Sequence, residues 1–239
     1  MRPRPPLRLF LAVLAGLAVM GLEPFGCDDG ALRQEARVEY LNDSTPLPDD
    51  VYAAGPINVT INFSLDLMDG NDVSVIGPDQ EEWTEGPVLV EDVGTALKKA
   101  LRAGMPDGGY EVSYRACLVS GECQEGSFSF RVDSALLSGY IDLRNRSEIV
   151  VEMSGNRFSP DRALVSAGTT VTWINREEAL HFVNTETHPE HTYFPAQNSL
   201  ALARDATFSV RFDRSGQYDY HCSAHYPEGM VGSIVVEDR

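Results

Sequence analysis

Apolar and polar residues alternate in short stretches along most of this chain. The two-residue period is clear in "VTINFSLDL", "YEVSYRA" and "FSFRV", and it returns after Ile149 in "IVVEM", "TTVTWIN", "TFSVRF", "QYDYHC" and "GSIVVE". Such alternation is typical of strands that bury one face. In the first stretch it predicts one face made of Val59, Ile61, Phe63, Leu65 and Leu67. One short piece, "VGTALKKALRAG", is helix-like instead.

Short strands at this spacing, separated by Gly, Pro, Asn and Asp, predict an all-β protein with two β-sandwich domains. We expect the first sandwich at residues 35–133 and the second at residues 148–239, in a chain of 239 residues. The stretch between them, residues 134–147, has no clear pattern and is predicted to be a linker.

The first 26 residues have the pattern of an export signal. Arg2, Arg4 and Arg8 precede an apolar run from Leu9 to Leu22, which is short for a membrane span and typical of a secretory segment. Gly26 stands directly before Cys27, so a lipoprotein form with acylated Cys27 is an alternative, and it would add a lipid anchor. Either form predicts the periplasm or the outer surface of a cytoplasmic membrane.

Export leads to an oxidising compartment, in which paired cysteines normally form disulfides. Cys117 and Cys123 flank the turn-like "LVSGE" and are the candidates for a disulfide between two strands. Cys27 is either part of the export-signal region or the residue that carries the lipid. Cys222 is then unpaired, which requires a chemical role or an intermolecular bond.

The formal net charge of −17 argues against binding to nucleic acid or to anionic membrane surfaces. It favours a partner protein with a basic docking surface, although solubility alone also accounts for it.

The stretch "YHCSAHYPEGM" gathers Cys222, His225 and Met230 in one loop. Strand alternation places Cys222 on the same face as Tyr218 and Tyr220, which we expect to be the core face. A second imidazole is expected from His181, just past the strand "VTWIN". Two imidazoles and a thiolate with a weak thioether form a blue-copper site, whereas zinc more often recruits several thiolates or carboxylates.

These residues, with the openings "GNRFSP" and "AGTTVTWIN", resemble a plastocyanin-type cupredoxin from about Ile149 to Arg239. The resemblance implies a Greek-key β-sandwich, one copper ion cycling between Cu(I) and Cu(II), and electron transfer rather than enzymatic catalysis. His181, Cys222 and His225 would be the equatorial ligands and Met230 the axial one.

The sequence departs from that family at two positions and leaves one question open. Phe182 follows the first ligand where relatives often carry Asn or Thr, so a hydrogen bond to the site is expected to be missing. His221 stands close to the position at which plastocyanins carry a surface tyrosine beside the ligand cysteine, so the docking route through that tyrosine is not expected here. His188 and His191 are candidates for a second weak metal site, or are simply exposed loop residues. With five histidines in all, the chain lacks the sets that multicopper oxidases and copper nitrite reductases require.

The first sandwich resembles the CopC-type domain of periplasmic copper resistance, through a Pro-rich entry, the strand "GGYEVSY" and the hairpin to "GSFSFRV". The resemblance implies an immunoglobulin-like fold. The copper histidines of that family are missing, because no histidine precedes His181. We therefore expect a spacer or docking module without copper.

Two functions follow. The first is an exported blue-copper electron carrier; the alternative is a copper-binding and delivery protein in periplasmic copper homeostasis or resistance.

Overall fold

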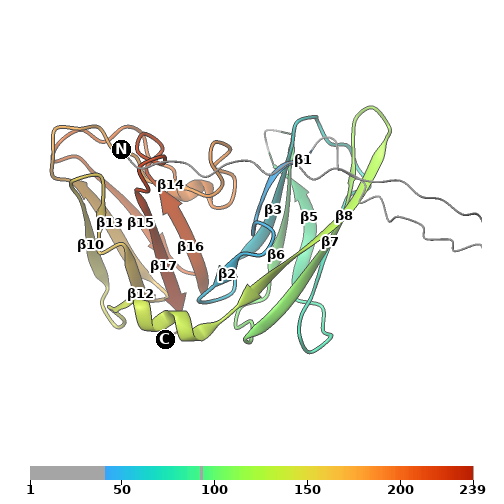
Figure 1. The fold of residues 1–239 in the computed structure, drawn as a ribbon, viewed down its shortest axis with the longest axis horizontal. Helices are drawn as coiled ribbons and strands as arrows, with labels where there is room; N and C mark the ends of the chain where they lie inside the picture. Colours follow the sequence, from blue (N-terminus) through green and yellow to red (C-terminus); the bar gives the residue numbers. More distant parts are fainter. Residues whose placement is uncertain (1–40, 92–93, 239) are drawn as a thin grey trace, which may run out of the picture. The chain divides into compact units, whose positions relative to one another are not determined.

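The N-terminal strands form two four-stranded sheets (Figure 1). The computed structural model describes residues 41–91 and 94–238, so the predicted export signal and Cys27 lie outside the described residues. One sheet has the order β1 (Leu41–Thr45), β3 (Asn58–Phe63), β6 (Ala96–Leu101) and β5 (Thr84–Val90). The other has the order β2 (Val51–Tyr52), β8 (Cys123–Val132), β7 (Gly108–Cys117) and β4 (Asp72–Ile76).

The core of this sandwich follows the predicted alternation with one exception. Val59, Ile61, Phe63 and Leu67 are buried as expected. Leu65 is 41% exposed, because β3 ends at Phe63 and the chain turns before Leu65. The two-residue period therefore holds only as far as the strand itself.

The helix-like stretch is a strand, so that prediction was wrong. Its residues form β6, which pairs antiparallel with β3 on one side and β5 on the other. Ala96, Leu97 and Leu101 are buried. An isolated helix of this length is marginal in water, whereas pairing on both edges gives the backbone groups of a central strand hydrogen-bond partners on each side.

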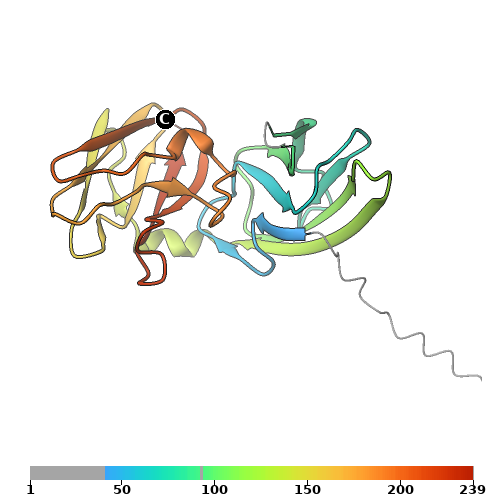
Figure 2. The same ribbon diagram turned by 90° about the horizontal axis from the view of Figure 1, so that it is seen from above.

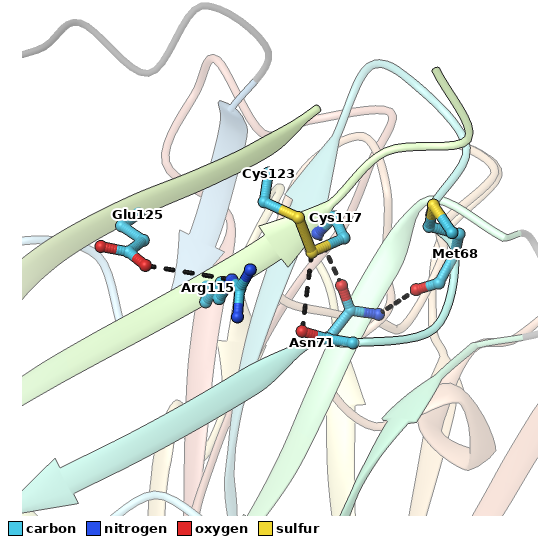
Figure 3. Close-up of a disulfide and its surroundings, with 7 residues drawn as sticks. Met68, Asn71, Arg115, Cys117, Cys123 and Glu125 are labelled. Atoms are coloured by element: carbon cyan, nitrogen blue, oxygen red, sulfur yellow. Dashed lines mark hydrogen bonds and ion pairs between the residues drawn. A yellow bond between two sulfur atoms is a disulfide. The ribbon is translucent and has the colours of Figure 1, made fainter. Parts of the chain in front are cut away.

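The β7–β8 hairpin ends in a disulfide between Cys117 and Cys123, with an S–S distance of 2.05 Å (Figure 3). The Asn71 side chain lies beside it: its Oδ1 accepts a hydrogen bond from the Cys117 N–H at 2.8 Å, and its Nδ2 donates to the Met68 carbonyl at 2.6 Å. Asn71 thus joins the loop before β4 to the tip of the hairpin.

The C-terminal strands form a second pair of sheets, seen as two layers in Figures 1 and 2. One has the order β11 (Phe158–Ser159), β10 (Glu148–Met153), β13 (Thr169–Asn175) and β15 (Thr207–Phe212). The other has the order β14 (Asn184–Thr185), β16 (Gly216–His221), β17 (Val231–Glu237), β12 (Arg162–Ser166) and β9 (Ile141–Asp142). The predicted all-β fold of two β-sandwiches is confirmed.

Parallel pairs within these sheets show that the chain crosses repeatedly between the layers. β10 pairs parallel with β13, and β12 pairs parallel with β17. The buried Trp173 and Tyr220 pack edge to face between the layers, with ring centroids 5.3 Å apart. Such aromatic packing contributes stability beyond the area it buries.

The predicted linker contains regular structure. Its first part is a 3-10 helix, η1 (Ser134–Gly139), which begins after Asp133 accepts a hydrogen bond from the Ala135 N–H. Its next part is β9, which pairs parallel with β12 in the C-terminal sheet. A second 3-10 helix, η2 (Pro195–Gln197), lies in the long connection before β15. Among the described residues, no helix is both long and apolar enough to cross a membrane.

Strand β16 is held between β14 and β17, both antiparallel to it. Tyr220 is the cross-strand partner of Gly232 on β17. A Cβ atom at Gly232 would collide with the Tyr220 ring, so the buried tyrosine occupies the space that any side chain at Gly232 would need.

Candidate metal centre

Cys222 follows the last residue of β16 and faces the core. Tyr218, Tyr220 and Cys222 belong to one buried cluster, as alternation along the strand predicts. The Cys222 N–H donates to the Met230 carbonyl at 3.0 Å, which ties the start of the following loop to its end. The thiol is therefore fixed by a sheet strand and is inaccessible to solvent.

The loop after Cys222 is a pair of tight turns. The Cys222 carbonyl accepts from the His225 N–H at 3.0 Å, and the His225 carbonyl accepts from the Met230 N–H at 3.2 Å. Gly229 has φ of 79°, in the left-handed region that glycine adopts readily. These turns place the His225 ring against the Cys222 sulfur and bury Met230 to 1% exposure.

His181 reaches the same sulfur from the connection that follows β13. Its backbone pairs with Leu202, donating at 3.2 Å and accepting at 2.8 Å. The side chain is fully buried. Its Nδ1 lies 3.6 Å from Cys222 Sγ, and Nδ1 of His225 lies 3.4 Å from the same sulfur.

The spacing of these donor atoms suits a single metal ion. Bonds of roughly 2.0 Å to nitrogen and 2.3 Å to sulfur, combined with separations of 3.6 and 3.4 Å, give N–metal–S angles of about 115° and about 105°. Both angles are those of a three- or four-coordinate site. Three of the four residues predicted from the sequence are thus brought together by their ligating atoms.

Met230 is buried in the same core cluster as Cys222 and is joined to it through the backbone. Its role as the axial ligand stays a prediction.

The Cys222 sulfur also receives a hydrogen bond, which the sequence reasoning missed. The Phe182 N–H lies 3.3 Å from Sγ. We expected a missing interaction because the Phe182 side chain has no donor, but the main chain supplies one. No sequence pattern could have indicated it, since every residue except proline carries an N–H.

A carboxylate lies behind His181. Oε1 of Glu177 is 2.7 Å from His181 Nε2, and the Glu177 N–H donates to the buried Asn175 side chain at 2.9 Å. Hydrogen bonds from the Gly155 N–H and from the His181 ring hold the pKa of Glu177 below its usual value. An ionised Glu177 fixes the His181 proton on Nε2 and leaves Nδ1 free to bind metal.

The structure brings the other three histidines together as well. Ligating nitrogens of His188, His191 and His221 all lie within 4.8 Å of one another. The sequence analysis named His188 and His191 as candidates for a second site and treated His221 separately, without linking the three. Burial, followed by the nearby His221 and His188, lowers the pKa of His191 to about 4.

Comparisons with known proteins found relatives of both domains. Residues 41–133 match the CopC domain family, and residues 147–237 match the copper-binding proteins of the plastocyanin/azurin family. Amicyanin of Paracoccus denitrificans is 34% identical over 37% of this chain and 65% of its own length, so the chain spans just under two thirds of that relative. Plastocyanin of Scenedesmus fuscus is 31% identical over 34% of this chain and 86% of its own length. A crystal structure of CopC from Methylosinus trichosporium OB3b is 23% identical, with a TM-score of 0.35, over 39% of this chain and 92% of that one.

The chain thus belongs to the plastocyanin/azurin family of copper-binding proteins and carries a CopC domain ahead of its cupredoxin domain. Both resemblances seen in the sequence are confirmed, and copper is confirmed as the metal. Copper also fits the residues present, because a thiolate and two imidazoles are the ligands that it prefers.

Proposed function

We propose that this chain is an exported electron carrier with a mononuclear type 1 copper site. Cys222 would bind as a thiolate, His181 and His225 through Nδ1, and Met230 as a weak axial ligand. The observation that supports this best is the convergence of one thiol and two imidazole nitrogens on the same point.

The fixed positions of these ligands suit rapid electron exchange. Bound copper supplies the one-electron couple between Cu(I) and Cu(II). Cys222 is held by β16, and His181 is held by its pairing with Leu202 and by Glu177. Ligands that are held this firmly move little when the charge changes. Because Cys222 and His181 are both fully buried, they exclude water, which suits a carrier rather than an enzyme.

His225 is the proposed port for electrons. It is half-buried, whereas His181 is fully buried, and its neighbours from Tyr226 to Gly229 are exposed. Only the His225 imidazole would then separate the metal from a partner that contacts this loop. The net charge of −17 supports a partner with a basic docking surface. Electron transfer to such a partner should slow as salt is added, because the attraction is screened.

We assign the parts of the chain as follows. Residues 1–26 direct export, with Cys27 as the site of a lipid anchor in the lipoprotein form. Residues 35–133 form the CopC-like domain, residues 134–147 the connection and residues 148–239 the copper domain. The proposed location is the periplasm or the extracytoplasmic surface of a membrane, as an export signal implies.

The test is the visible and EPR spectrum of the mature chain with one equivalent of Cu(II). A type 1 site gives a strong absorption at roughly 600 nm, the copper–thiolate region. Cys222→Ser should abolish the band, while the neighbouring loop variant Ala224→Ser should keep it. A colourless wild-type complex, or a coloured Cys222→Ser complex, would overturn the proposal.

The CopC match favours a second candidate, copper delivery in homeostasis or resistance. The absence of any histidine before His181 weakens it, because that domain lacks the expected copper ligands. A transfer assay separates the two functions. A delivery protein passes copper to an acceptor chelator within minutes, whereas an electron carrier keeps its ion through repeated reduction and oxidation.

A further inference from the structure

A second group of three imidazoles lies in the same domain, outside the proposed blue-copper site. His221 is the last residue of β16 and is fully buried. His188 and His191 belong to the segment that follows β14, which pairs with β16. Nε2 of His191 lies 3.1 Å from Nε2 of His221. With metal–nitrogen bonds of roughly 2.0 Å, that separation gives an N–metal–N angle of about 100°.

Glu186 orients His221 in the way that Glu177 orients His181. Oε1 of Glu186 lies 3.2 Å from Nδ1 of His221. A proton held on Nδ1 by this carboxylate leaves the Nε2 lone pair directed at His191. A carboxylate behind an imidazole is the usual support of a metal-binding histidine, because it fixes the tautomer and raises the basicity of the other nitrogen.

Further contacts hold the three rings in place. The Asn184 side chain donates to Ser223 Oγ at 2.8 Å, and that hydroxyl lies 3.1 Å from Nε2 of His191. The Tyr226 ring stacks on His188, with centroids 4.9 Å apart and planes 21° apart. The His191 N–H donates to the Thr187 carbonyl at 2.7 Å. His188 is the exposed member of the three, and its ligand atom already lies within 4.8 Å of the ligand atoms of the other two.

From this geometry we infer that His188, His191 and His221 form a second metal site, which binds Cu(II) through three imidazoles. Neutral imidazoles suit copper and zinc, and among divalent ions of the first transition row copper binds such sites most tightly. The site contains no thiolate, so its copper would lack the intense absorption near 600 nm. The second site does not depend on the proposed electron-carrier function, since it shares no ligand with the first.

The test is copper stoichiometry in the full mature chain. Protein is first loaded with one equivalent of Cu(II) and then titrated with a second by calorimetry, with EPR after each step. We expect two copper ions per chain, the second with a type 2 EPR signal that shows coupling to nitrogen. His188→Ala and His191→Ala should each remove the second ion and leave the first spectrum unchanged. Glu186→Gln should weaken the second binding step roughly 10–100-fold, as removal of such an outer partner does elsewhere.

Glu190→Ala is the matched control, because Glu190 is an exposed residue between the two loop histidines. It should bind the second ion like the wild type. The Cys222→Ser variant should also keep the second site, which separates failure of this inference from failure of the blue-copper proposal. Saturation of the wild type at one copper would overturn the inference. An equal loss of second-site copper binding in Glu190→Ala and His188→Ala would also overturn it. So would displacement of the second Cu(II) by an equal concentration of Zn(II).

Discussion

Oε1 of Glu177 lies 2.7 Å from Nε2 of His181, on the side of the ring away from Cys222. The carboxylate therefore fixes which nitrogen of the buried imidazole faces the sulfur. Its own neighbour in sequence, Glu178, is exposed and pairs with Arg204 instead. The two adjacent glutamates thus provide a matched pair for experiment.

Glu177→Gln should weaken copper binding roughly 10–100-fold, because an amide is a poorer acceptor for the His181 proton than a carboxylate. The loss is measured by competition with a chelator, together with the reduction potential. Glu178→Gln should leave both unchanged. Equal effects of the two substitutions would show that surface charge, and not orientation of His181, is responsible.

Phe182→Pro should lower the reduction potential of the site. Proline removes the N–H that donates to Cys222 Sγ at 3.3 Å. That hydrogen bond draws electron density from the sulfur and so favours the reduced ion, and its loss favours the oxidised one. Phe182→Ala keeps the N–H and is the control. The measurement is cyclic voltammetry, with circular dichroism to verify the fold; a potential that falls equally in both variants would contradict the explanation.

Gly232→Ala should destabilise the C-terminal domain by about 1–3 kcal/mol, the cost of overpacking a filled core. The added methyl group collides with the buried Tyr220 ring, which is already packed against Trp173. Gly109→Ala is the control, because nothing lies within 4 Å of a Cβ at that position. Urea unfolding of the full chain measures both. If Gly109→Ala lowered the free energy of unfolding as much as Gly232→Ala does, the steric argument would be contradicted.

Asp142 should titrate with a midpoint near 2. The Arg144 guanidinium, which contacts both of its oxygens at 2.6 and 3.0 Å, lowers the pKa of this carboxyl from 3.8 to about 2. A lowered folded-state pKa adds stability above the unfolded value, and this is lost as the pH falls from about 4 to about 2. Because the pair is exposed, the effect on stability should be small and weakened by salt.

Carbon-13 NMR of the Asp142 carboxyl against pH measures this midpoint directly. Arg144→Gln should raise it toward 3.8. Arg146→Gln, which changes a nearby exposed arginine, should leave it in place. A midpoint near 2 that survives Arg144→Gln would show that another group is responsible.

The sequence predicted the fold class and named most of the candidate metal ligands. Alternation identified the core face of β16, and spacing alone linked Cys222, His225 and Met230, because all of them lie in one loop. His181 was placed near the site because it comes just after the strand "VTWIN", although Cys222 lies about forty positions further along the chain.

What the sequence missed depends on backbone geometry or on contacts distant along the chain. The hydrogen bond from Phe182 to Cys222 comes from the main chain, which carries no signal in the residue type. The grouping of His221 with His188 and His191 depends on how the segment after β14 returns over β16. The residues of β6 locally favour a helix, which is why the sequence predicted one. In the fold, pairing with a strand on each edge outweighs that local preference.

The pairing of Tyr220 with Gly232 has a consequence for metal selectivity. Side chains on a strand change face with every residue, so a slip of β16 by one position would exchange the places of His221 and Cys222. The core would then receive an imidazole, and the thiol would join the other two histidines. After such a slip a residue with a side chain, Val231 or Ser233, would stand beneath the Tyr220 ring. Gly232 leaves room for that ring where a side chain would collide with it, so this glycine favours the register that keeps Cys222 on the core side of β16 and His221 on the opposite side.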